Sequence, residues 1–367
     1  MKKILSFFLT IIMIFTCGAL LSSCKEQSPQ LETTSSVQNL VILIGDGMGE
    51  NHIKNAKMKY GIGSLEFEND FKCKVNTDSK TLIGPTDSAA AATAMATGKS
   101  VNNKVVSKDG NKNIETILEY ASKNGMKTGV VTTDTLSGAT PACFSSHAKE
   151  RGDSLDILLG QLESNVDLFI GQTNSAYISH ASDFRNKGYT VVENFTDLKE
   201  TKNDEKVVAL LDNIKSIYNE ELSDQTDFSE IVNFATSHLE NENGFVLMVE
   251  CAHIDKFSHK KNLLPALAEV HTLFDVANTL YAYDKAHNNN TAIIITADHE
   301  TGGLALARDK KYLESSTGNS LYKRSGHTNT NVNLYVHNVK FKDQATKVKN
   351  TFVFTISKFV IDNRKTA

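Results

Sequence analysis

The clearest structural signal in the chain is the stretch LVILIGDG at residues 40–47. Its first five residues are all apolar and branched, which is typical of a strand buried on both faces of a parallel sheet. Glycine, aspartate and glycine then end the strand. Similar short apolar runs stand at Gly129–Val131, Phe245–Val249 and Ala292–Thr296. Four such runs predict a sheet with a well-buried centre.

Helical patterns separate these runs. We expect helices at residues 88–97, 114–124 and 265–285. Alternating strands and helices predict an α/β fold, a three-layer α/β/α sandwich with a mostly parallel central sheet. Residues 180–240 are more polar, and there we expect only peripheral helices and connections.

Composition narrows the class of protein. The 367 residues are 40% apolar and 22% charged, which suits a globular chain of one large or two ordinary domains and excludes a disordered one. Lysine and arginine (39) are outnumbered by aspartate and glutamate (43), and they form no long basic block, so we expect no nucleic-acid recognition. Five cysteines without a CxxC pair argue against a cysteine-built zinc site.

The N-terminus has the layout of an export signal. Lys2 and Lys3 precede an apolar run at residues 4–21, and the following LSSC ending at Cys24 resembles a bacterial lipobox. An uncleaved membrane anchor is the alternative, because 18 residues lie near the lower limit for crossing a bilayer. We predict a lipoprotein signal peptide at residues 1–23 and a lipid on Cys24. The mature protein is then extracytoplasmic and anchored to a membrane, in the periplasm or at the cell surface.

Acidic residues follow three of the predicted strands. Asp46, Glu250 and Asp298 each stand at or just after a strand's end. In open α/β sheets, ligands bind beyond the carboxyl ends of the strands. One acid there could simply cap a helix, but several close carboxylates repel one another unless a cation neutralises them. The pattern favours a metal site at this edge of the sheet.

Histidines accompany these acids. Asp298 and His299 are adjacent, and Asp255 and His259 are four residues apart, which places both on one side of a helical turn. His327, in a polar loop, is a further candidate nitrogen ligand. Mixed carboxylate and imidazole ligands suit zinc, whereas an all-oxygen set suits magnesium.

The second functional signal is the stretch GPTDSAAAAT at residues 84–93. A glycine-proline turn leads into an alanine-rich helix that begins at or near Ser88. Serine at this position is a good N-cap. A helix N-terminus also attracts phosphate and favours an oxyanion, so the same residue suits a nucleophile. The capping role and the catalytic role are compatible.

Together these motifs resemble those of the bacterial alkaline phosphatases. The resemblance runs from Asn39 to about Val336 and consists of five separated motifs in the family's order. It implies a site for two zinc ions and one magnesium ion. The zinc ligands that it implies are Asp255, His259 and His327 for the first ion, and Asp46, Asp298 and His299 for the second.

The same resemblance implies roles for the other site residues. Ser88 matches the metal-contacting nucleophile that becomes phosphorylated. The implied magnesium ligands are Asp46, which would bridge to the second zinc, Thr140 and Glu250, while Arg151 would clamp the phosphate and Lys256 would contact it through water. Relatives usually carry aspartate or histidine beside the third metal, where this chain has Gly138. Because glycine offers no ligand, we expect magnesium to bind there more weakly or through additional water.

The implied activity is hydrolysis of phosphate monoesters to an alcohol and inorganic phosphate, through a phosphoseryl intermediate. A sulfatase is excluded, because its motif needs proline and arginine soon after the nucleophile, whereas Ser88 is followed by four alanines. Two alternatives stay open: a phosphodiesterase of the same superfamily, which the dianion-binding Arg151 disfavours, and a noncatalytic lipoprotein that binds phosphate or metals. We expect a polar tether at residues 24–38 and one alkaline-phosphatase-like catalytic domain at residues 39–367. The resemblance also implies a homodimer.

Overall fold

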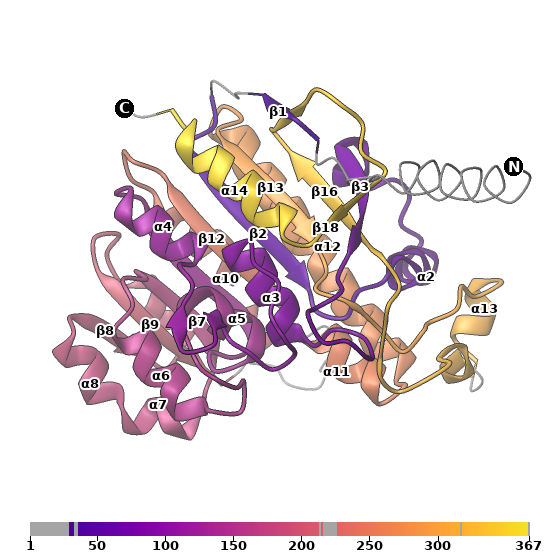
Figure 1. The fold of residues 1–367 in the computed structure, drawn as a ribbon, viewed down its shortest axis with the longest axis horizontal. Coiled ribbons are helices and arrows are strands. Elements are labelled where there is room, and N and C mark those ends of the chain that lie inside the picture. Colours follow the sequence, from indigo (N-terminus) through magenta and orange to yellow (C-terminus); the bar gives the residue numbers. More distant parts are fainter. Residues whose placement is uncertain (1–28, 33–35, 213, 216–225, 316–317, 366–367) are drawn as a thin grey trace, which may run out of the picture.

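The computed structural model describes residues 29–32, 36–212, 214–215, 226–315 and 318–365 (Figure 1). The signal peptide and Cys24 lie outside these residues, so both stay predictions. None of the described helices is both long enough and apolar enough to cross a membrane. The three cysteines in the described part, Cys73, Cys143 and Cys251, are buried free thiols.

A ten-stranded sheet runs through the molecule, in the order β18-β3-β16-β13-β2-β12-β6-β7-β9-β8. From β13 to β8 all neighbouring strands are parallel, whereas β16 runs antiparallel to both of its neighbours. The mostly parallel sheet predicted from the apolar runs is confirmed. Its strands are β2 Asn39–Gly45, β3 Phe71–Asn76, β6 Lys127–Thr135, β7 Leu168–Gln172, β8 Tyr189–Val192, β9 Lys206–Leu211, β12 Phe245–Cys251, β13 Thr291–Thr296, β16 Val332–His337 and β18 Lys347–Lys349.

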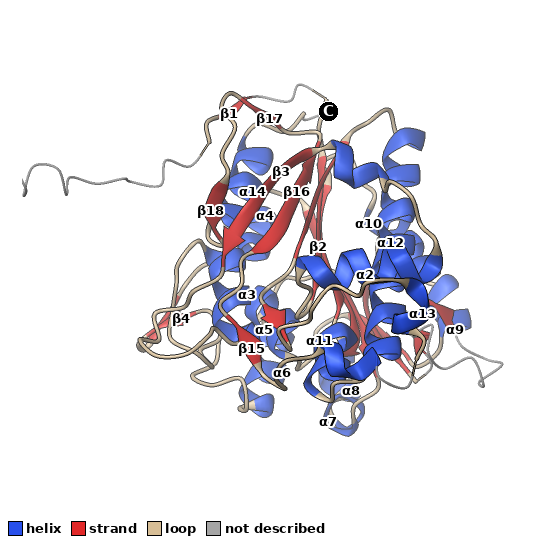
Figure 2. Cartoon of the chain, turned by 90° about the vertical axis from the view of Figure 1, so that its right-hand side faces the viewer, coloured by secondary structure: helices blue, strands red, loops and turns tan. Residues whose placement is uncertain are grey.

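Helices cover both faces of this sheet, as Figure 2 shows. One face carries α3 Ser88–Thr97, α4 Ile117–Lys123 and α14 Phe352–Asp362, and the other α2 Glu50–Tyr60, α10 Phe228–Leu239 and α12 Leu263–Ala286. The three-layer α/β/α prediction is therefore confirmed. The remaining helices are α5 Ala139–Ser145, α6 Ser154–Leu162, α7 Ser175–Ser179, α8 Ala181–Asn186, α9 Phe195–Lys199, α11 His253–His259 and α13 Lys310–Leu313, with short 3-10 turns at Glu66–Asn69 and Gly318–Leu321.

Among the described residues there are also four two-stranded pairs: β1 Leu31–Glu32 with β17 Lys340–Phe341, β4 Lys108–Asp109 with β5 Lys112–Asn113, β10 Ile214–Lys215 with β11 Thr226–Asp227, and β14 Glu300–Thr301 with β15 His327–Thr328. The last pair matters for function. Thr301 is paired with His327, so the segment after β13 is held against the loop that carries the distant histidine.

The order of the central strands brings the acidic residues together. β13, β2, β12 and β6 are consecutive and parallel, so their carboxyl ends meet at one edge. Ile44 of β2 is level with Thr296 of β13 on one side and with Glu250 of β12 on the other. Asp46 stands two residues after Ile44, and Asp298 stands two residues after Thr296. Parallel pairing alone therefore gathers three acids that are up to 252 positions apart in the sequence.

Two expectations about secondary structure were wrong. Residues 180–240 contain strands β8 and β9 of the central sheet, not only helices and connections. The apolar run of β9, five residues long and bordered by polar ones, is buried between β7 and β8. The helix predicted at 114–124 begins only at Ile117, because the Thr116 hydroxyl accepts from the Glu119 backbone N–H and caps it.

Candidate active site

Two groups of metal-ligand atoms lie at the carboxyl edge of the sheet. One consists of Asp46, Asp298 and His299, and the other of Asp255, His299 and His327. Within each group the ligand atoms lie within 4.8 Å of one another. Because His299 belongs to both, the two groups adjoin, as they must if two metal ions are to act on one substrate.

The first group is built from the ends of β2 and β13. His299 Nε2 lies 3.2 Å from Asp298 Oδ2 and 3.7 Å from Asp46 Oδ1. Asp298 Oδ1 accepts from the backbone N–H groups of Gly47 and His299, at 2.9 and 2.8 Å, which fixes the orientation of the carboxylate. Its other oxygen and Asp46 Oδ1 are buried without a hydrogen-bond partner in the structure. Buried oxygens of this kind are costly, and a bound cation would satisfy both.

Electrostatics lead to the same conclusion. Burial raises the pKa of Asp46 well above its usual value, and Asp298 and Asp255 raise it further. Three mutually repelling carboxylates in a low-dielectric site are stable as anions only beside positive charge. Burial also lowers the pKa of His299, which favours the neutral imidazole that can bind a metal.

The second group joins α11 to the loop that carries His327. His259 Nε2 lies 3.3 Å from Asp255 Oδ2, and His327 Nε2 lies 3.6 Å from Asp255 Oδ1. Asp255 and His259 thus lie on one side of a helical turn, as predicted, and His259 is counted with the second group from here on. The Thr301 hydroxyl donates to Asp255 Oδ1 at 2.5 Å, which orients this carboxylate.

His327 and the adjoining His259 are oriented by backbone carbonyls. His327 Nδ1 lies 2.8 Å from the Thr86 carbonyl oxygen, and His259 Nδ1 contacts that of Ser325. In each ring Nδ1 therefore carries the proton, and in the neutral form Nε2 presents a lone pair. The two Nε2 atoms lie 3.0 Å apart. Either a proton on one ring or a metal ion beside both nitrogens removes the repulsion between facing lone pairs, and Asp255 raises the pKa of His259. With Asp255 alongside, the residues present fit a zinc site.

Ser88 is buried at the start of α3, close to both groups. Its side-chain oxygen lies 3.3 Å from His299 Nε2, and only 2% of the residue is exposed. The helix N-cap is Asp87 and not Ser88, because the Asp87 carboxylate accepts from the Ala90 backbone N–H. The sequence suggested Ser88 as the N-cap, but Asp87 has that role. The N-terminal end of the helix dipole still favours an anionic oxygen at Ser88.

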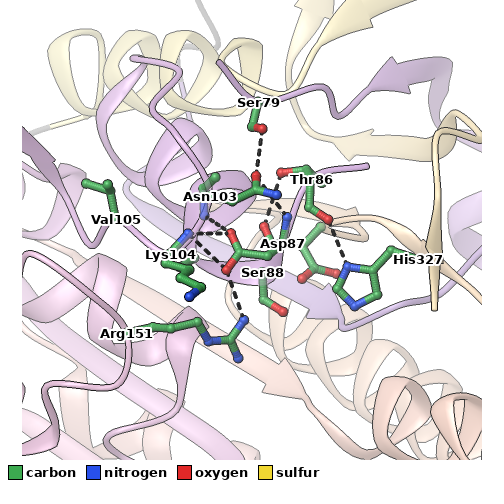
Figure 3. A network of polar contacts seen from close by, with 12 residues as sticks. Ser79, Thr86, Asp87, Ser88, Asn103, Lys104, Val105, Arg151 and His327 are labelled. Carbon is green, nitrogen blue, oxygen red and sulfur yellow. Dashed lines mark hydrogen bonds and ion pairs between the residues drawn. The ribbon is translucent and has the colours of Figure 1, made fainter. Parts of the chain in front are cut away.

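The Asp87 carboxylate also positions Arg151 (Figure 3). It accepts from the Lys104 backbone N–H at 3.0 Å and from Arg151 Nη1 at 3.3 Å. In Figure 3 the Ser88 hydroxyl points into the space between the Arg151 guanidinium and the His327 ring. One acid therefore caps the helix that carries Ser88 and holds the guanidinium that faces it.

Glu250 and Thr140 lie next to the first ligand group. Burial raises the pKa of Glu250 to about 7, although the Thr132 hydroxyl donates to its carboxylate and lowers the pKa in part. Thr140 is completely buried in α5 and lies close enough to Glu250 to lower that pKa as well. Its hydroxyl nevertheless forms no hydrogen bond of normal geometry in the described part of the chain. Such an oxygen set suits a hard cation such as magnesium.

Asp134, near the carboxyl end of β6, was not among the residues that the motifs singled out. Its Oδ1 lies 2.5 Å from Nζ of Lys256, the lysine expected to contact phosphate through water. The same signal that indicated Asp46 could have found Asp134, because this acid also follows an apolar run, Gly129–Val131, toward the site edge.

Comparison with known proteins decides the family. The family model described as "Alkaline phosphatase" matches residues 37–167 and 176–359. The chain belongs to the alkaline phosphatase family. Every site residue predicted from the motifs lies within the matched ranges, and all of them come from the edge of the sheet described above or from the helices and loops beside it.

Individual alkaline phosphatases resemble the chain over most of its length. "Alkaline phosphatase 4" of Bacillus subtilis is 27% identical over 309 residues, which cover 79% of this chain and 67% of that protein. The alkaline phosphatase of Schizosaccharomyces pombe is 30% identical over 323 residues, which cover 77% of this chain and 59% of that protein. The chain thus spans about two thirds or less of the length of these relatives.

Solved structures agree on the fold. Alkaline phosphatase from the Antarctic bacterium TAB5 superposes with a TM-score of 0.78 at 25% identity, covering 91% of this chain and 99% of that one. The predicted alkaline-phosphatase-like fold is confirmed.

A cavity of about 670 Å³ opens beside the site. Pro85, which leads into the Ser88 turn, and Glu300, which follows His299, line one part of it. Lys323 and Arg324 line another part. The cavity therefore adjoins the turn before Ser88 and the β14–β15 pair.

Proposed function

We propose that this protein hydrolyses phosphate monoesters to an alcohol and inorganic phosphate, through a phosphoseryl intermediate at a site for two zinc ions and one magnesium ion. The observation that carries the proposal is the position of Ser88. Its hydroxyl lies 3.3 Å from His299, the residue shared by both ligand groups, and faces Arg151 across the same space. The proposed nucleophile therefore lies beside both the candidate metal ligands and a guanidinium that can bind an anion.

The reaction then has two displacements. Ser88 Oγ forms a bond to phosphorus while the bond between phosphorus and the alcohol oxygen breaks. Water next attacks the phosphoserine, which releases inorganic phosphate and restores the serine. Zinc ions bound to the two ligand groups would stabilise negative charge on the attacking and leaving oxygens. The N-terminal end of α3 adds favourable potential at the Ser88 oxygen.

Arg151 would hold the phosphoryl group during both steps. Its planar fork can donate two parallel hydrogen bonds to two non-bridging oxygens, a geometry that lysine cannot supply. A monoester dianion offers those oxygens, whereas a diester replaces one of them with a second ester group. Asp87 restricts the guanidinium through its contact with Nη1, so less rotamer freedom is lost when substrate binds.

Relatives support the metals. A variant of the TAB5 enzyme, 25% identical to this chain, is described with magnesium bound in its M3 site. We assign the magnesium of the present protein to Asp46, Thr140 and Glu250, and the zinc ions to Asp46, Asp298 and His299 and to Asp255, His259 and His327. The orphaned oxygens of Asp46, Asp298 and Thr140 are the structural support for this assignment.

An assay with paired substrates tests the proposal. The metal-loaded protein is expected to hydrolyse p-nitrophenyl phosphate at alkaline pH and to prefer it strongly over bis-p-nitrophenyl phosphate. Arg151→Ala should lower kcat/KM for the monoester by roughly 10- to 100-fold, since charge-assisted hydrogen bonds of about 1.5–3 kcal/mol are lost. In the same variant kcat/KM for the diester should change much less, so the ratio of monoester to diester kcat/KM should fall.

Arg308→Ala serves as the matched control, because that side chain is 78% exposed and pairs with Asp309 outside the site. A preference for the diester would favour the phosphodiesterase alternative. Hydrolysis of neither ester, with both metals bound, would leave the noncatalytic binding protein as the better description.

We also propose that the protein is exported and held at a membrane by a lipid on Cys24. The support is the charged and apolar N-terminal pattern with its lipobox-like end. Cys24→Ser is expected to move most of the protein out of the membrane fraction. If that variant stayed in the membrane, the apolar segment would be acting as an uncleaved anchor.

A further inference from the structure

Gly138 offers no side chain where relatives usually carry aspartate or histidine, and a neighbouring carboxylate, that of Asp134, lies beside it. A Cβ atom added to Gly138 would lie 3.2 Å from Asp134 Oδ2. The nearest atom to that Cβ would be the Thr135 carbonyl oxygen, at 3.0 Å, so a side chain at position 138 would begin directly beside the Asp134 carboxylate. Both residues stand at the same edge, one near the end of β6 and the other at the start of α5.

The surroundings of this carboxylate indicate a cation. Asp134 is close enough to Glu250 for its negative charge to add to the raised pKa of that residue. Thr140, two residues after Gly138, is fully buried beside the same glutamate, and its hydroxyl makes no hydrogen bond of normal geometry in the described part of the chain. Asp46 contributes a further unpartnered oxygen and also experiences the charge of Glu250. Negative charge and buried acceptors thus collect here with fewer donors than they need.

Lys256 partly balances this charge from α11. Its Nζ contacts Asp134 Oδ1 at 2.5 Å, while Oδ2 is the oxygen that faces Gly138. The two oxygens of one carboxylate therefore point to different neighbours. Asp134 is the more buried partner of this ion pair, since its side chain is 20% exposed and that of Lys256 is 44% exposed.

We propose that Asp134 is a positioning residue of the third cation site, where it replaces the side chain missing at position 138. Its carboxylate orders water around a bound magnesium ion beside Glu250 and Thr140, and it fixes Lys256. This inference rests on the proposed magnesium site. With Asp134 in this role, a chain that has glycine at position 138 still has a carboxylate beside the magnesium site.

Calorimetric titration of magnesium into zinc-loaded protein tests this role. Asp134→Asn keeps the size of the side chain but removes its charge. It is expected to weaken magnesium binding by about 10- to 100-fold, the range typical of residues that support metal ligands. Zinc content, measured by mass spectrometry of the metals, should be unchanged. Asp109→Asn, a loss of one exposed carboxylate in β4, is the control and should leave magnesium affinity unchanged.

A swap of positions provides the second arm. Asp134→Ala should weaken magnesium binding, and adding Gly138→Asp to that variant should restore at least part of it, because the new carboxylate enters the space that Asp134 has left. Unchanged magnesium affinity in Asp134→Asn would overturn the inference, and so would failure of the double variant to bind magnesium better than Asp134→Ala alone.

The outcomes separate this inference from the proposed function. If the wild-type protein bound magnesium and zinc but hydrolysed no monoester, the proposed function would fail while the role of Asp134 could still be measured. If the wild type were active and Asp134→Asn bound magnesium normally, only the inference about Asp134 would fail.

Discussion

Ser88→Ala is expected to lower kcat for a phosphate monoester by at least about 10³-fold, because the attacking atom of the first displacement is removed. Ser88 is buried, so the variant creates no new exposed surface, and alanine suits the first turn of the alanine-rich α3. The cap from Asp87 is independent of the serine hydroxyl. Steady-state kinetics with p-nitrophenyl phosphate measure the effect.

Ser357→Ala is the matched control. This serine is also fully buried in a helix, α14, where its hydroxyl donates to the Val353 carbonyl oxygen. It should keep near wild-type kcat even if stability falls slightly. Zinc content should be the same in Ser88→Ala as in the wild type. Turnover of Ser88→Ala within tenfold of the wild type would mean that water attacks the substrate directly.

Removing the metals is expected to abolish nearly all activity and to lower the thermal midpoint as well. Without cations, Asp46 and Asp298 keep buried oxygens that lack hydrogen-bond partners among the described residues. Dialysis against a chelator, followed by stepwise addition of zinc, measures both effects. Activity and thermal midpoint should return together as zinc approaches two ions per chain.

Magnesium alone should not restore the activity, since histidine nitrogens are poor ligands for this hard cation. His299→Ala gives a stricter version of the experiment, because His299 belongs to both ligand groups. It should reduce zinc binding more than a change in one group alone, such as His259→Ala. Full activity after complete removal of zinc would contradict the two-metal account.

Much of the site could be predicted because it depends only on the direction of parallel strands and on the spacing of residues along a helix. Acids at the ends of parallel strands must meet at one edge, and Asp255 and His259 must share one side of α11. The direction of side chains could not be predicted in this way. Asp134 is an acid near a strand end like the others, but only the folded chain shows its oxygen in the space beside Gly138.

Contacts between residues far apart in the sequence could not be predicted from the sequence either. The sequence indicated His327 as a ligand candidate, but its 3.0 Å approach to His259 depends on the β14–β15 pairing and on the Thr86 carbonyl, which belong to other parts of the chain. The capping role of Asp87 was missed because serine and aspartate are both good N-caps, and the choice between neighbours depends on backbone geometry. Strands β8 and β9 were missed because the stretch 180–240 around them is more polar than the rest of the chain, although the apolar run of β9 is as long as the one at 40–44.

The central claim is that the substrate's phosphoryl group passes through Ser88. Its most direct test is to mix the metal-loaded protein with a phosphate monoester, quench in acid and map phosphopeptides by mass spectrometry. The account predicts phosphate on Ser88 in the wild type and no phosphopeptide in Ser88→Ala. Continued turnover with no phosphorylated residue, or with phosphate on a residue other than Ser88, would contradict it.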